Sequence, residues 1–379
     1  MKNQKICIIG DGLTGLTTAL ALKNPNLNID LYFPKKNYNT LDSRITAVSD
    51  SNYVFLKKIL HPFNKKIFWS CNEINLFSEN KERLLNFLNF KEKSQTLMHI
   101  FENGRYKKDL FKKFNNKNIK FINKIVTNVN YKDGYVRTNK SKTSYDLIIL
   151  CLGSKSKLYD GITGNKSIHK NYNEIAITGY VSHKLDNINP SQYFLKEGPL
   201  ALLPFSKNKI SFVWSLDKNF YEQNKNGLKK IVKEKITELL KIKSKLTLSK
   251  IQNFPIHLDL KKKYFENNTL ILGEGLHSIH PIAGQGFNLV IRDINKLSQI
   301  INNYLNLGMT LKNSCILKEF YEARKAENLF FGLGVDFTNV FFKKNKYLDP
   351  LKNIILKNIS SSYYIKKFSK IVSNRGINI

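Results

Sequence analysis

The stretch KICIIGDGLTGLTTALALK, residues 5–23, joins a short apolar run to a glycine-rich turn and then to leucines at helical spacing. Gly10, Gly12 and Gly15 form a G-x-G-x-x-G at this turn, where bare backbone lets a pyrophosphate sit on the N-terminus of the following helix. NIDLYF at 28–33 is predicted to be a second strand. This order predicts the βαβ start of a dinucleotide-binding domain. It does not distinguish FAD from NAD, and a packing turn is the alternative explanation of the glycines.

Later segments indicate that the chain leaves this first sheet and returns to it. YDLIILCLG at 145–153 is a continuous apolar run typical of a buried parallel strand, and TLILGEG at 269–275 is a second one that ends in glycines. Between them, residues 172–215 form alternating segments that predict an antiparallel sheet. Residues 83–90 and 105–114 are predicted to be helical.

The resulting prediction is an α/β fold with a Rossmann-type lobe that is discontinuous in sequence, an interposed antiparallel β-sheet lobe and C-terminal helices. The first lobe is assigned to residues 1–75, 101–170 and 266–320. The second lobe is assigned to residues 76–100 and 171–265, and a C-terminal helical region to residues 321–379.

Charge is the strongest compositional signal, because 62 basic and 29 acidic residues give the chain a net charge of +33. Lys is abundant in strands, loops and helices alike, which favours a general compositional bias. Attraction to an anionic membrane is the second explanation. A nucleic-acid-binding segment would concentrate the charge, whereas runs such as 261–263 are short and widely separated, so nucleic acid is the least favoured partner.

The cysteines and the hydropathy exclude several classes of protein. The four cysteines are scattered without a CxxC pair, which excludes a disulfide framework and a zinc ribbon and favours a reducing compartment. No run of about 18 apolar residues is present, so an ordinary transmembrane helix is excluded. The N-terminus lacks a small-residue cleavage site, and we expect a cytoplasmic protein.

A second motif is GEGLHSIHPIAGQGFNLVIRD, residues 273–293, in which a strand, a glycine-rich loop and a helix N-terminus follow one another. Such a loop offers backbone N–H groups to an anionic or electron-rich ring edge. Gly284 and Gly286 permit close approach of a planar ligand, and Gln285 and Asn288 supply polar contacts. A turn before a surface helix would explain the glycines but not the His-Pro-x-x-Gly-Gln-Gly order.

This segment resembles the flavin-contacting signature of the FAD-dependent ubiquinone-biosynthesis hydroxylases, a family of class A flavoprotein monooxygenases. Other stretches agree with the family pattern: DSRITAVS at 42–49, GPLALLPF and SFVWS within 198–215, RKAEN at 324–328 and NRG at 374–376. The similarity covers essentially the whole chain. The combination of motifs is far more specific than any one of them.

The resemblance implies a flavin-dependent aromatic hydroxylase that carries FAD and takes electrons from NAD(P)H. Through a C4a-hydroperoxyflavin it would transfer oxygen from O2 to the ring of a polyprenylated phenol in ubiquinone biosynthesis. The glycines of the first motif would meet the pyrophosphate, Arg44 the phosphates or the ribityl chain, and the loop from Pro281 to Asn288 the isoalloxazine. The cofactor-binding residues carried over by position are Gly10, Gly12, Gly15, Arg44, Glu274, Pro281, Gly284, Gln285, Gly286 and Asn288. Substrate would lie between the flavin and the sheet that bears Leu202, Pro204 and Trp214.

The chain departs from the family pattern at several positions. Phe33 stands where an acidic residue should hold the adenosine ribose, and Leu152 stands in place of the Asp of an Asp-Gly pair. Glu274 replaces an Asp, and Lys107 replaces an amide. Charge-assisted hydrogen bonds contribute roughly 1.5–3 kcal/mol each, so their loss would weaken FAD binding unless other contacts offset it. Lys107 and Lys35 are the candidates for compensating phosphate contacts.

His277 and His280 lie three residues apart, but no third ligand lies at a suitable spacing, and we expect no metal site. His280 is the one candidate for a catalytic general base, and a structural role in shaping the loop is the competing explanation. The catalytic residues are otherwise unassigned.

The C-terminal segment has apolar residues on one helical face, among them Leu348, Leu351, Ile355 and Ile359, with Lys between them. Such a tail either lies on an anionic bilayer or packs against the protein's own body. In the first case the protein would be peripheral on the inner face of the cytoplasmic membrane. Because of Phe33 and Leu152, a degenerate flavin-binding protein or a non-catalytic accessory subunit of a quinone-synthesis complex is the alternative function.

Overall fold

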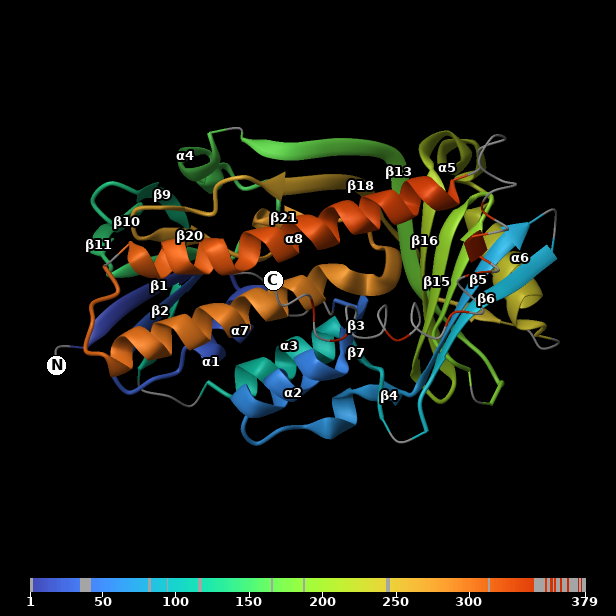
Figure 1. Cartoon of the computed structure of the whole chain (residues 1–379), viewed down its shortest axis with the longest axis horizontal. Helices are drawn as coiled ribbons and strands as arrows, with labels where there is room; N and C mark the ends of the chain where they lie inside the picture. The colour runs from blue at the N-terminus through green and yellow to red at the C-terminus, as the bar shows by residue number, and fades with distance from the viewer. Residues whose placement is uncertain are drawn as a thin grey trace.

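The computed structural model describes residues 3–34, 42–80, 83–93, 95–114, 118–164, 166–186, 188–242, 246–312 and 314–343, together with residues 352, 355, 356, 358, 362, 367, 374 and 376. Two large sheets lie at opposite ends of the molecule (Figure 1). The long helices α7 (Gln285–Asn306) and α8 (Cys315–Phe342) pack side by side and run from one sheet towards the other.

The first sheet has six strands in the order β19-β20-β12-β1-β2-β8. The strands are β1 (Gln4–Ile9), β2 (Leu27–Phe33), β8 (Ile119–Asn123), β12 (Leu147–Leu150), β19 (Phe265–Glu266) and β20 (Thr269–Ile271). All neighbours are parallel except β19 and β20. Ile8 pairs with Leu31 on one side and Ile149 on the other, and all three are fully buried. The predicted βαβ start and the predicted return of the chain to this sheet are therefore confirmed.

Helices cover this sheet because each has one apolar face to bury. Leu16, Ala19 and Leu20 of α1 (Leu13–Ala21) join the same core as Ile294 and Leu297 of α7. Two shorter helices, α2 (Asp50–Ile59) and α3 (Asn103–Lys112), pack beside α7 and α1 respectively. The segment predicted to be helical at 105–114 corresponds to α3.

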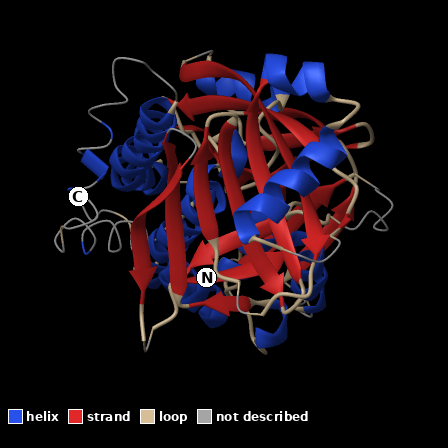
Figure 2. Ribbon diagram, turned by 90° about the vertical axis from the view of Figure 1, so that its right-hand side faces the viewer, coloured by secondary structure: helices blue, strands red, loops and turns tan. Residues whose placement is uncertain are grey.

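The second sheet has nine strands, and eight of them follow the order β21-β18-β13-β16-β15-β14-β5-β6, while β17 pairs with β13. They are β5 (Glu73–Asn80), β6 (Arg83–Lys91), β13 (Ser167–Ser182), β14 (Ser191–Leu195), β15 (Gly198–Ser206), β16 (Lys209–Asp217), β17 (Thr247–Leu248), β18 (Gln252–Lys261) and β21 (His277–Ser278). Every pair is antiparallel except β14 and β5. One face packs against α5 (Lys218–Asn224) and α6 (Leu228–Leu240), and Figure 2 shows a helix crossing the strands.

A small sheet of β3 (Ile45–Ser49), β7 (Met98–Glu102) and β4 (Trp69–Cys71) lies between the two large ones. Its strand β3 contacts α7 on one side and β15 on the other. A second small sheet is formed by β9 (Val126–Asn130), β10 (Tyr135–Thr138) and β11 (Ser141–Ser144). The short helix α4 (Asp160–Thr163) contacts β19.

The prediction of a helix at residues 83–90 is wrong, because these residues belong to strand β6. The run RLLNFLNFK has apolar residues at spacings that suit either structure, and pairing with β5 from Glu73 to Asn80 decides for the strand. The expected boundary after residue 170 falls within β13, which enters the second sheet at Ser167.

Candidate functional site

A cavity of about 2210 Å³ lies between the two large sheets. A typical small-molecule pocket holds roughly 300–1,000 Å³, so this cavity has room for a dinucleotide and a second ligand. Its wall combines the glycine-rich turn after β1, strand β3, the loop before α7 and one face of the second sheet. The two glycine motifs of the sequence are thereby brought to one space.

The glycine-rich turn needs its glycines for two different reasons. Gly10 has a φ of +124°, and a Cβ atom there would lie 2.2 Å from the Cys151 carbonyl oxygen. A Cβ at Gly15 would lie 1.9 Å from the Gly10 oxygen, so both positions are fixed by packing. At Gly12, by contrast, a Cβ would meet no described atom within 4 Å, and the residue lines the cavity. The backbone at Gly12 therefore lies open at the start of α1, which suits a pyrophosphate.

The loop before α7 presents a second helix N-terminus to the cavity. Gly284 has a φ of +61° and is the N-cap residue of α7. In the described structure no side chain caps this helix, so its first N–H groups are available to a ligand. Pro281, Gln285 and Gly286 line the cavity beside it. The Gln285 Oε1 atom is buried without a hydrogen-bond partner among the described residues, as expected for an acceptor that a ligand would satisfy.

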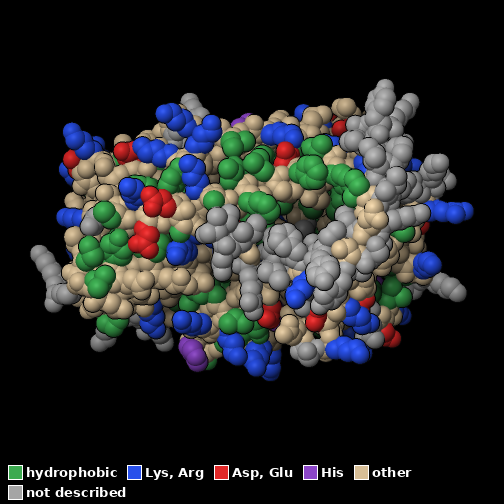
Figure 3. Space-filling view, viewed as in Figure 1, with side chains coloured by type: hydrophobic (Ala, Val, Ile, Leu, Met, Phe, Trp, Pro, Cys, Tyr) green, Lys and Arg blue, Asp and Glu red, His purple; other side chains and the backbone are tan. Residues whose placement is uncertain are grey.

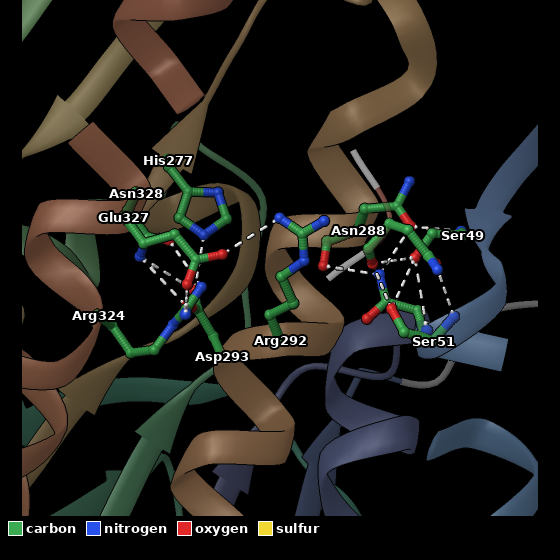
Figure 4. Close-up of polar contacts among 11 residues, drawn as sticks. Ser49, Ser51, His277, Asn288, Arg292, Asp293, Arg324, Glu327 and Asn328 are labelled. Carbon is green, nitrogen blue, oxygen red and sulfur yellow. Dashed lines mark hydrogen bonds and ion pairs between the residues drawn. The ribbon is translucent and has the colours of Figure 1, made fainter. Parts of the chain in front are cut away.

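The Asn288 side chain is engaged within the protein, although the residue lines the cavity. Its Oδ1 accepts from the Ser49 amide at 2.8 Å, and its Nδ2 donates to the Ala47 and Gly284 carbonyls. Asn288 therefore ties the loop to β3, and its amide is not free for a ligand. Figure 4 shows Asn288 beside Ser49 and Ser51. The backbone oxygen of Asn374 accepts from both of these serine hydroxyls, so this first residue of the NRG motif reaches the cavity wall.

His280, the suggested general base, lines the cavity but is engaged on both ring nitrogens. The side chain is fully buried, its Nε2 lies 2.8 Å from a Glu174 oxygen, and its Nδ1 accepts from the Ile282 amide at 3.3 Å. Both ring nitrogens are therefore engaged within the protein, Nε2 with Glu174 and Nδ1 with the Ile282 amide. Burial raises the pKa of Glu174, but hydrogen bonds from His280 and Lys343 outweigh it and leave that pKa below its usual value. His280 thus shapes the loop.

His277 belongs to a buried network that joins the loop to both long helices (Figure 4). Its Nε2 lies 2.7 Å from Asp293 of α7, and the Nε of Arg324 of α8 donates to the same carboxylate at 2.6 Å. Burial raises the pKa of Asp293, but Arg324 and His277 lower it by more than burial raises it. The pKa is therefore below its ordinary value, and the carboxylate is charged. Arg324 also pairs with Glu327. The RKAEN motif, which sequence reasoning matched without assigning a role, therefore fixes α8 on α7.

The described residues contain no group of three His, Cys, Asp or Glu side chains that could hold a metal ion.

The end of the cavity near β2 is aromatic and basic. Phe33 lines the cavity and packs edge-on against Phe121 at 5.8 Å. Asp30, three residues earlier on β2, accepts from the Tyr145 hydroxyl at 2.8 Å and is not part of the wall. Leu152 also lines the cavity. The acids that line the described wall are Asp11, Asp42 and Glu274, of which Asp11 pairs with Lys107 and Asp42 with Arg44.

Three charged candidates also reach this wall. Arg44 lines the cavity and is held by Asp42 through bonds of 2.8 and 2.7 Å. Burial raises the pKa of Asp42, but the bonds from Arg44 outweigh it and lower that pKa. Glu274 lies on the wall and is exposed. Lys107 pairs with Asp11, and Lys35 lies outside the described residues.

The substrate residues suggested by the sequence lie on the wrong face of the second sheet. Leu202, Pro204 and Trp214 are buried away from the cavity, and Trp214 donates its Nε1 proton to the Gly198 oxygen at 3.2 Å. Leu202 and Trp214 belong to the core that also holds Val232 and Ile236 of α6. Because side chains alternate along a strand, a shift of one residue changes the face. The residues of β15 and β16 that line the cavity are Ala201, Leu203 and Val213.

The rest of this wall is apolar and was missed by sequence reasoning. It is formed by β5, β6 and the start of β7, and its members include Ile74, Leu76, Phe90, Leu97 and Met98. The only available signal was the apolar content of residues 83–90, which was interpreted as a helix.

Comparison with known proteins agrees with this geometry. Residues 157–308 match a family model described as an FAD binding domain. A ubiquinone biosynthesis monooxygenase COQ6 of Dictyostelium discoideum is 30% identical over 205 residues, which cover 45% of this chain and 41% of that protein. The COQ6 protein of Schizosaccharomyces pombe is 22% identical and aligns over 96% of this chain and 90% of its own length. The chain is therefore similar to ubiquinone-biosynthesis monooxygenases, in agreement with the resemblance that its motifs show.

The fold is that of the class A FAD monooxygenases, to which this hydroxylase family belongs. The crystal structure of p-nitrophenol 4-monooxygenase PnpA from Pseudomonas putida superposes with a TM-score of 0.80, at 13% identity and with full coverage of both chains. The alignment with the Dictyostelium relative spans only about two fifths of that protein. The matching family model describes a domain that binds FAD. The open backbone at Gly12 and the uncapped N-terminus of α7 suit the phosphates and the ring of that cofactor.

Proposed function

We propose that this protein is an FAD-dependent monooxygenase that hydroxylates the aromatic ring of a polyprenylated phenol in ubiquinone biosynthesis, with NAD(P)H as electron donor. The observation that carries the proposal is the continuity of the cavity from Gly12, past the loop before α7, to the apolar wall around Leu203 and Val213. A protein that only bound a flavin would have no need of this second, apolar compartment. The family relationship supports the same function.

Bound FAD, once reduced, supplies the activation of O2. The protein's part is to hold it: the backbone at Gly12 and the N-terminus of α1 bind the pyrophosphate. The N-terminus of α7, which no side chain caps in the described structure, would hold the isoalloxazine and would stabilise negative charge at the ring edge. Asn288 keeps this loop against β3.

The apolar wall determines where the phenol lies. Ala201, Leu203 and Val213 face the loop across the cavity, and Leu76 and Phe90 extend the wall towards the strands β5 and β6. This surface excludes water from the reacting atoms and suits the first isoprene units of a prenyl tail. Since His280 has no free nitrogen, we assign the reaction to positioning of an electron-rich ring and name no general base.

We further propose that the protein contacts an anionic membrane through the outer face of α8. Phe330, Leu333, Phe337 and Val340 recur on that face and are 42–69% exposed. Figure 3 shows hydrophobic side chains along the course of this helix. A chain of net charge +33 repels copies of itself and is attracted to acidic phospholipid, which favours a membrane over a homodimer. Within the part of the chain that the structure describes, no helix combines the length and apolar character needed to span a bilayer. Most of the C-terminal segment predicted to be amphipathic lies outside the described residues.

Vesicle co-sedimentation tests the membrane contact. Phe337→Glu should reduce binding to vesicles that contain acidic phospholipid, whereas Leu307→Glu, a change at an equally exposed leucine after α7, should not. Equal binding of both variants would contradict the proposal.

The experiment that tests the catalytic proposal starts with the absorbance spectrum of the gently purified protein and a titration with FAD. NAD(P)H-dependent O2 consumption is then measured with and without a prenylated phenol, and the product is identified by mass. A product heavier by one oxygen atom supports the proposal. FAD binding without such a product would contradict it, and absence of FAD binding would favour the accessory-subunit alternative, which Phe33 and Leu152 motivate.

A further inference from the structure

Helix α3 presents a basic face to the cofactor end of the cavity. The wall here is lined by Lys107, Lys108, Phe111 and Lys112 of α3. Lys124, which directly follows β8, lines the same cavity. Most of these lysines are exposed, and a surface lysine alone says little about binding. Lys107 differs from them in its surroundings.

The Lys107 ammonium is held in place by two fixed groups. Its Nζ lies 3.1 Å from an Asp11 oxygen, and it lies 5.8 Å from the centre of the Phe111 ring. The Lys107 and Asp11 side chains are only 30% and 17% exposed. Asp11 stands between Gly10 and Gly12, within the turn whose backbone is open to the cavity. The ion pair therefore places a positive charge beside the turn that binds the pyrophosphate.

At the same end of the cavity, positions 33 and 152 carry no carboxylate that could bind sugar hydroxyls, and the Asp11 carboxylate is engaged by Lys107. Phe33 and Leu152 are apolar, and Asp30 is engaged by Tyr145. Hydrogen bonds to the ribose are thus replaced by positive charge near the phosphates. The two changes occur at one site, and their effects on affinity are opposite in sign.

We propose that Lys107, positioned by Asp11, binds the pyrophosphate of FAD and supplies the affinity that the substitutions at Phe33 and Leu152 remove. This inference rests on the proposed function, because it assumes that FAD occupies the cavity. Binding then depends on the phosphate charges, weakens with added salt, and extends to ligands that share the adenosine diphosphate half of FAD.

A purely structural ion pair between α3 and the turn is the competing explanation. Such a pair would contribute to the stability of the apoprotein and not to ligand affinity. A partly exposed ion pair contributes little to folding, so its loss should leave the protein folded.

The test is a titration of the apoprotein with FAD and, separately, with ADP, which carries the phosphates without the flavin. Lys107→Met should lower the affinity for FAD and for ADP by roughly 10- to 100-fold. It should also make the affinity less dependent on salt concentration. Lys107→Arg should keep most of the ADP affinity because it keeps the charge. Lys108→Met is the matched control, since Lys108 is the next residue, lines the same cavity and is exposed.

Each outcome bears on one of the two proposals. If wild-type protein binds FAD and Lys107→Met behaves like Lys108→Met, the role of Lys107 is wrong and the proposed function stands. If wild-type protein binds neither FAD nor ADP, the proposed function itself fails. If Lys107→Met lowers the thermal stability of the apoprotein but leaves both affinities unchanged, the ion pair is structural and the inference is overturned.

Discussion

The Nε2 atom of His280 lies 2.8 Å from the Glu174 carboxylate, and this bond joins the loop before α7 to strand β13. A histidine beside a flavin site invites a catalytic role, but here both ring nitrogens are occupied.

Replacement of His280 should therefore act on stability. We expect His280→Ala to lower the free energy of unfolding by about 1–3 kcal/mol, because it removes one of the donors to the buried Glu174 carboxylate. The pH dependence of turnover should not change in whatever fraction folds. Chemical denaturation and a pH–rate profile check this. Unchanged stability with a lost limb of the pH profile would restore the general-base role.

Two glycines of the phosphate-binding turn should respond to alanine in opposite ways. Gly15→Ala brings a Cβ within 1.9 Å of a backbone oxygen, so we expect a loss of roughly 2 kcal/mol or more in stability. Gly12→Ala meets no described atom within 4 Å and has an ordinary φ of −71°, so the protein should fold normally. Its methyl group would enter the cavity and weaken FAD binding. Thermal melts with FAD titrations separate these effects, and normal FAD affinity in Gly12→Ala would contradict our placement of the pyrophosphate.

The two faces of strand β16 provide a matched pair of substitutions. Val213→Phe should fill the cavity and raise KM for the phenol by roughly 10-fold or more while FAD affinity and stability change little. Trp214→Phe, one residue later, should lower stability by about 1–3 kcal/mol and leave KM unchanged, because Trp214 packs against α6 and donates to Gly198. A reversed pattern would mean that the sheet faces the other way.

The buried carboxylates predict acid sensitivity. Asp293 and Glu174 have pKa values in the folded protein below their ordinary values of 3.8 and 4.5. The unfolded protein therefore binds more protons than the folded protein at acidic pH. The two carboxylates contribute fully to stability at a pH above their ordinary pKa values, and this contribution is lost as the pH falls through their lower pKa values in the folded protein. Denaturant midpoints measured from neutral pH downwards should fall in this range. Asp293→Asn should be less stable at neutral pH and show a shallower decline, and an unchanged decline would contradict the assignment.

Sequence patterns predict the parts of the fold that depend on local chemistry. The turn at Gly10–Gly15 and the helix after Gly284 were predictable, because the backbone there adopts conformations or close approaches that glycine allows and other residues do not. The face of β15 was not predictable in the same way. GPLALLPF is apolar at consecutive positions because both of its faces are covered, one by α6 and one by the cavity wall, so period-two alternation cannot tell Leu202 from Leu203.

Strand β6 and the RKAEN network depend on partners that are distant in sequence. β6 is a strand because β5 and β14 extend the second sheet to it, and nothing within residues 83–90 encodes that pairing. Arg324 was visible as part of a motif, but its partner Asp293 lies 31 residues earlier on another helix.

The discontinuity of the first sheet has a consequence for how the protein is made. β1 acquires its neighbour β12 only when residue 150 has been synthesised, and β20 and the flavin-facing loop arrive more than a hundred residues later. A nascent chain on the ribosome thus carries a phosphate-binding turn long before it has the other half of the cavity. Because pairing between distant segments is slow, capture of the cofactor has to wait until the loop before α7 has been made and the strands of the first sheet have paired.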